Sequence, residues 1–91
     1  MKIVLNKCFG GFGLSEEAYK FLGLKWDKYG YTFCEYDKRT DKKLIECVEK
    51  LGDKASGYGA KLEVVEIPDN IEWTIENYDG VETCEEKHDS W

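Results

Sequence analysis

The sequence has little proline, histidine or methionine, and it has no long apolar run. Each of these three residue types occurs once among the 91 residues. The segment Met1 to Lys7 holds three consecutive apolar residues between charged ones, whereas a membrane span needs about 20. We therefore expect neither export by a signal peptide nor a membrane-embedded chain, and we predict a cytoplasmic protein.

Close cysteine pairs are also missing. Cys8, Cys34, Cys47 and Cys84 form no Cys-x-x-Cys motif, and they are too sparse for the disulfide framework of a small secreted domain. His88 lies four residues after Cys84, but a structural zinc site needs four ligands in close pairs. We predict reduced thiols, no metal and no cofactor.

Positive charge is scarce in the last third of the chain. Residues 1–62 carry a net charge of +3 and residues 63–91 carry −9, which gives −6 overall. Binding to nucleic acid through its phosphates needs a basic stripe. The sequence therefore disfavours a direct nucleic-acid binder, and the acidic segment favours a basic protein partner.

Apolar residues, at 42%, and 13 aromatic residues are enough for one folded domain spanning 1–91. Two helices are predicted, one over 16–22 between an N-cap at Ser15 and Gly23, and one from the N-cap Asp41 along a stripe of apolar residues. That stripe consists of Leu44, Val48, Leu51 and Ala55.

Strands are predicted over 2–7, 31–36 and 61–67, the last of them central in the sheet. Residues 71–77 alternate, and Asp79-Gly80 favours a two-residue turn that pairs 81–86 back on them. The predicted fold is α+β, with a mixed three- to five-stranded sheet, two helices on one face and a C-terminal β-hairpin.

A glycine-rich segment links the first strand to the first helix. A strand, a glycine loop and a helix N-terminus together form a common anion-binding arrangement, because backbone amides converge there. We predict that this loop binds a phosphorylated small molecule or a nucleotide through Cys8, Phe9, Gly10, Gly11, Phe12, Gly13 and Ser15. In that reading Phe9 and Phe12 are stacking walls. The alternative is that the glycines only turn the chain while both phenylalanines cover the core.

Cys8 in this loop resembles, superficially, the cysteine of low-molecular-weight tyrosine phosphatases and of the B components of sugar phosphotransferase systems. The position that must be arginine in such phosphatases is Leu14. No residue would then clamp the phosphoryl oxygens. Catalysis is the weakest reading, and a structural thiol is the expected one.

A second candidate site is acidic. Glu72, Glu76, Glu82 and Glu86 recur along the predicted hairpin, and with Trp91 they could form a surface that mimics a nucleic-acid backbone for a basic host protein. The alternative is a solvated strand face that keeps a sheet edge from aggregating.

The segments KIVLNKCFGGFGLS (2–15), VEIPD (65–69), YDG (78–80) and EKHxxW (86–91) resemble those of a family of short, uncharacterised bacteriophage and prophage proteins. The resemblance implies a viral accessory protein that acts in the cytoplasm of a bacterial host against host defence, and it supplies no catalytic residues. A homo-oligomer is also expected, because so small a core gains from burying a further edge.

Overall fold

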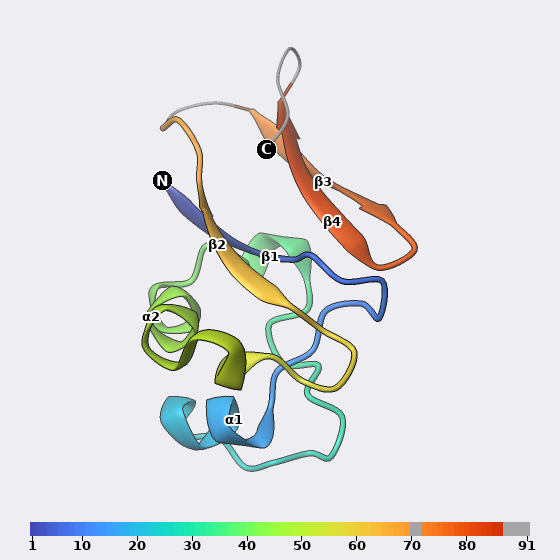
Figure 1. Ribbon diagram of the computed structural model, residues 1–91. Coiled ribbons are helices and arrows are strands. Elements are labelled where there is room, and N and C mark those ends of the chain that lie inside the picture. The colour runs from blue at the N-terminus through green and yellow to red at the C-terminus, as the bar shows by residue number, and fades with distance from the viewer. Residues whose placement is uncertain (70–71, 87–91) are drawn as a thin grey trace.

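The chain forms two antiparallel two-stranded sheets and two α-helices in the computed structural model, which describes residues 1–69 and 72–86 (Figure 1). The elements are β1 (Lys2–Asn6), α1 (Glu16–Leu22), α2 (Lys42–Leu51), β2 (Leu62–Glu66), β3 (Trp73–Tyr78) and β4 (Val81–Glu86), with 3₁₀ turns at Tyr36–Lys38 and Gly52–Ala55. The predicted α+β class and C-terminal hairpin are confirmed. Within the described ranges no helix has both the length and the apolar character needed to cross a membrane.

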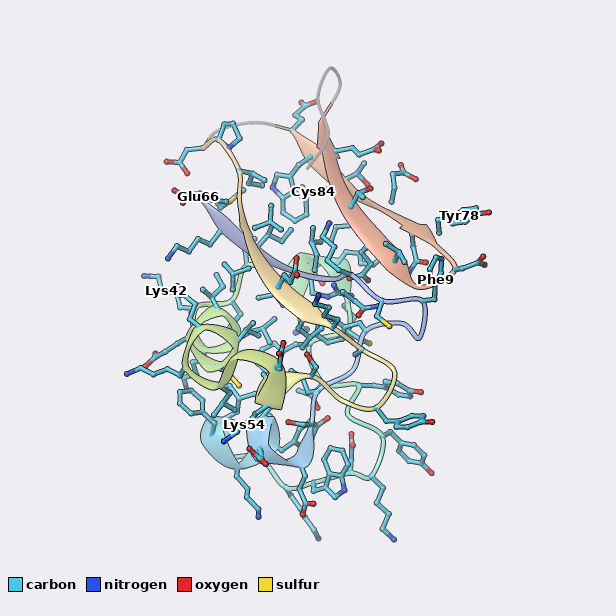
Figure 2. All side chains as sticks on the ribbon, in the orientation of Figure 1. Phe9, Lys42, Lys54, Glu66, Tyr78 and Cys84 are labelled. Atoms are coloured by element: carbon cyan, nitrogen blue, oxygen red, sulfur yellow. The ribbon has the colours of Figure 1, made fainter. Side chains whose placement is uncertain are left out.

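The β1–β2 sheet is the middle layer of the fold. Both helices lie on one side of it and the β3–β4 hairpin on the other (Figure 1). Val4 belongs to the core on the helix side, and its neighbours Ile3 and Leu5 belong to the core shared with the hairpin. Figure 2 shows Cys84 of β4 in that second core, between the two sheets.

Both helices begin where capping residues satisfy their first amides. The Ser15 hydroxyl accepts from Ala18 N at 3.1 Å, and Asp41 Oδ1 accepts from Lys43 N at 2.8 Å. Gly23 ends α1 in the left-handed conformation, with φ 73°. The predicted range of the first helix and the N-cap of the second are both confirmed.

The predicted mixed sheet with 61–67 at its centre is wrong. Each sheet has two strands, both pairings are antiparallel, and β2 pairs only with β1 in the described part of the chain. The strand covered on both faces is β1, because Ile3, Val4 and Leu5 are all fully buried. In β2, Glu63 is exposed and the two valines are half-buried.

Residues 31–36 do not form the predicted strand. Phe33 has a positive φ of 69°, which no regular strand accommodates, and Tyr36 already starts a 3₁₀ turn. The carbonyls of Phe33 and Cys34 accept hydrogen bonds from the guanidinium of Arg39 instead of from a neighbouring strand. A side chain thus satisfies this backbone, and no ladder is needed.

The hairpin follows the predicted turn chemistry. Asp79 and Gly80 have φ values of 51° and 94°, as a type I′ turn requires. In the register, Ile75 lies opposite Cys84 and Asn77 lies opposite Glu82. Ile71, predicted to belong to the first strand of the hairpin, lies outside the described residues.

Candidate functional site

The glycine loop, residues 8–15, is where several parts of the backbone meet. Gly13 O accepts from Gly57 N at 2.9 Å, and Leu14 N donates to Gly30 O at 2.8 Å. A Cβ on Gly10 would overlap the carbonyl oxygen of Gly59. The loop therefore needs glycine partly for close backbone packing, as the turn interpretation predicts.

The outer side of the loop lines a pocket of about 310 Å³. That volume is at the lower end of the range for small-molecule sites. The lining residues come from the loop, from the segment after α1 and from the segment before β2. They are Gly10, Gly11, Phe12, Gly13, Leu14, Ser15, Glu16, Trp26, Lys28, Tyr29, Tyr31, Ser56, Gly57 and Tyr58.

Three tyrosines in this lining are strongly exposed. Tyr29 and Tyr31 are 72% and 60% exposed, and Tyr58 is fully exposed. The rings of Tyr29 and Tyr31 stack with centroids 6.2 Å apart and an interplanar angle of 15°. Large aromatic side chains are normally buried, so a group of exposed rings beside a pocket indicates a contact surface.

Segment 26–32, which carries Tyr29 and Tyr31, is held in place by a buried residue of α1. The hydroxyl of Tyr19 donates to Asp27 Oδ2 at 3.1 Å and accepts from Thr32 N at 3.0 Å. The Tyr19 ring also contacts Trp26 edge-on, with centroids 5.0 Å apart. Tyr19 itself is 1% exposed, so the core fixes both ends of the segment 26–32.

Asp27 shapes the turn that carries the first two tyrosines. Its Oδ1 accepts from Tyr29 N and Gly30 N, both at 2.8 Å. These backbone hydrogen bonds, from Gly30 first and then from Tyr29, lower the pKa of the Asp27 carboxyl below its usual value. Lys28, between Asp27 and Tyr29, has a φ of 71°, which is unfavourable for a lysine.

The groups at the end of the loop that were predicted to bind an anion already have hydrogen-bond partners within the protein. Ser15 N donates to Ala55 O, and the Ser15 hydroxyl is engaged with Ala18 N and Lys54 O, so these groups are already satisfied. Glu16 puts a carboxylate at the same place. Helix α1 has seven residues, and the start of so short a helix is a weak anion site. Lys28 is the cation in the lining, and sequence reasoning missed it.

Five of the seven predicted loop residues line the pocket, and Cys8 and Phe9 do not. Phe9 is 70% exposed and lies near Tyr78 at the turn end of the hairpin (Figure 2). Phe12 is 8% exposed, and the Arg39 guanidinium carbon lies 3.8 Å from its ring centroid. The two phenylalanines are therefore not stacking walls. Besides the nearly buried Phe12, the aromatic residues that line the pocket are Trp26, Tyr29, Tyr31 and Tyr58.

One of the glutamates predicted to form the acidic surface, Glu82, is buried. Glu82 is 1% exposed and forms a two-pronged ion pair with Arg39, whose Nη2 lies 2.8 Å from Glu82 Oε2. Asn6 N also donates to Glu82 Oε1 at 2.8 Å. Glu82 is therefore a core residue that joins β4 to β1, and the prediction that it belongs to an interaction surface is wrong.

The remaining acidic positions do not form one ladder. Glu72 and Glu76 are exposed, as predicted. The register puts Glu76 opposite Thr83 and leaves Glu82 on the other face of the hairpin. Glu86 pairs with Trp73 in the register, and Trp91 lies outside the described residues.

All four cysteines are free thiols, with Cys47 and Cys84 buried and Cys8 and Cys34 half-buried. Burial raises the pKa of the Cys47 and Cys84 thiols. In the part of the chain that the structure describes, no three of the histidine, cysteine, aspartate and glutamate side chains gather as metal ligands would. His88 lies outside that part.

Comparison with protein-family models, with curated proteins and with solved structures finds no match. The resemblance to phage proteins is therefore neither supported nor contradicted, and it stays a prediction.

Proposed function

We propose that the protein is a non-catalytic binding module that holds a nucleotide-like ligand between its glycine loop and its exposed tyrosines. The observation that carries this proposal is the joint lining of one pocket by Gly10–Ser15 and by Tyr29, Tyr31 and Tyr58. Every nucleobase has a π-face, and stacking on an aromatic side chain contributes about 1–3 kcal/mol per base.

The charges of the lining fit a ligand of low charge. Lys28 can pair with one phosphate group, while Glu16 opposes a second phosphate group. We expect the base to supply most of the binding energy and the phosphate to fix the orientation of the ligand in the pocket. With the resemblance to phage proteins, such a module would act by sequestering a nucleotide signal of the host.

The glycines of the loop carry no side chains, so a ligand can approach the backbone of the loop. Gly13 lines the pocket, and a Cβ built on it meets no atom within 4 Å. The first atom of a side chain at Gly13 therefore meets no neighbour. We expect Gly13→Leu to occupy part of the pocket and to leave its walls in place.

Isothermal titration calorimetry with adenosine, AMP, GMP and ribose 5-phosphate tests the proposal. AMP and GMP should bind, adenosine should bind more weakly, and ribose 5-phosphate should not bind. Tyr31→Ala should weaken AMP binding about 5- to 150-fold, which is the stacking energy converted to an affinity ratio. Tyr78→Ala is the matched control, because Tyr78 is 76% exposed but lies on the hairpin. Failure of every nucleotide to bind the wild-type protein would refute the proposal.

A further inference from the structure

A second pocket adjoins the first one and shares a wall with it. It has a volume of about 500 Å³ and is lined by Asp27, Tyr31, Thr32, Phe33, Glu35 and Lys38. Tyr31 lines both pockets. Two separate hollows therefore share one exposed aromatic residue, whose ring is stacked on that of Tyr29.

The two pockets have similar chemistry. Each combines aromatic side chains with one lysine, Lys28 in the first and Lys38 in the second. The second pocket offers the half-buried ring of Phe33, next to Tyr31. An aromatic wall with one cation is what a base and an adjoining phosphate require.

We infer that the two pockets are subsites of one extended site for a ligand with two nucleobases joined through a single phosphate, with Tyr31 in the wall that the two subsites share. This inference rests on the proposed function of the first pocket. One base stacks in each subsite, and the linking phosphodiester lies between Lys28 and Lys38.

The acidic residues of the lining favour one bridging phosphate over several. Glu16 lies in the first pocket and Glu35 in the second, while the Asp27 carboxylate is already hydrogen-bonded to Tyr29 N and Gly30 N. The first subsite holds Lys28 with Glu16, and the second holds Lys38 with Glu35 and Asp27, so neither subsite has an excess of positive charge. A dinucleoside monophosphate, with one negative charge, fits this balance better than a ligand with terminal phosphates.

Calorimetry with ApA, pApA and AMP tests the inference on the full chain. ApA should bind at least tenfold more tightly than AMP, with one ApA per chain, and pApA should bind more weakly than ApA. Lys38→Glu should remove the advantage of ApA and leave AMP binding in the first pocket unchanged. Lys42→Glu is the control, because Lys42 is exposed and starts α2.

The outcomes separate the two proposals. One AMP per chain, with ApA no tighter than AMP, would overturn the two-base ligand and leave the proposed function standing. An unchanged advantage of ApA in Lys38→Glu would overturn the assignment of the second subsite. Absence of binding by ApA, pApA and AMP alike would overturn both proposals.

Discussion

Replacing Glu82 by alanine should remove a large part of the folding free energy, although the sequence places Glu82 in an acidic surface segment. The side chains of Arg39 and Glu82 are 1% and 2% exposed. Removing one partner of a buried ion pair costs about 3–5 kcal/mol, because the other charge stays buried without compensation. Asn6 N would lose its acceptor as well. A domain of this length has about 5–13 kcal/mol of stability in total.

Urea denaturation followed by circular dichroism measures this loss, and two variants control it. Glu76→Ala removes an exposed glutamate from the same hairpin and should change the free energy of unfolding by less than about 0.5 kcal/mol. The double variant Arg39→Met with Glu82→Leu should recover part of the loss, since no charge is then buried alone, although Asn6 N and the carbonyls of Phe33 and Cys34 lose these partners. A Glu82→Ala protein within about 1 kcal/mol of wild type would refute the buried pair as the link between β4 and β1.

Three further predictions concern the pocket and the thiols. Lys28→Gly should raise the free energy of unfolding by about 1 kcal/mol, since glycine adopts the φ of 71° without strain. The same variant should bind AMP more weakly, because it lacks the lysine of the pocket. A variant less stable than the wild type would contradict the proposed backbone strain at Lys28. The pKa of Asp27 is lowered in the folded state, so its contribution to stability is complete above its usual value of 3.8 and is lost as the pH falls through the lower folded pKa. Nuclear magnetic resonance of segment 26–32 should therefore show that the order of the segment weakens as the pH falls below about 3.8, with Asp27→Asn lacking that pH dependence; the same pH dependence in both proteins would contradict this. Iodoacetamide at pH 8 should label Cys8 and Cys34 in the native protein and label the buried Cys47 and Cys84 only after denaturation; equal labelling of all four would contradict their burial.

Local signals in the sequence predicted the local parts of the fold. The caps at Ser15 and Asp41 act within three residues, and the Asp79-Gly80 turn fixes the pairing of its own two strands. Such features depend on neighbouring residues alone, so a single sequence is enough to find them.

Long-range contacts decided what the sequence could not predict. Segment 31–36 has strand-forming residues, but its carbonyls are satisfied by Arg39, the only arginine of the chain. Glu82 is buried because that same arginine, 43 positions away, lies against it. The one available signal was that Glu82 shares a strand face with Cys84, two residues on.

Only one side of the candidate site was predicted from the sequence. Glycines after a strand identified the loop side of the pocket, but its aromatic walls come from two other segments. Those segments reach the loop through backbone hydrogen bonds such as Leu14 N to Gly30 O. No periodicity in the sequence reports such a contact. Tyr29 and Tyr58 lie outside the predicted helices and strands, and Tyr31 belongs to the predicted strand 31–36.

A titration of the ¹⁵N-labelled protein with AMP, followed by amide chemical shifts, tests directly whether the pocket binds a nucleotide. We expect the shifts to change at Gly10–Ser15, at 26–31 and at 57–58, and we expect Gly13→Leu to abolish these changes. Unchanged shifts, or changes confined to the hairpin residues near Phe9 and Tyr78, would contradict the proposed binding.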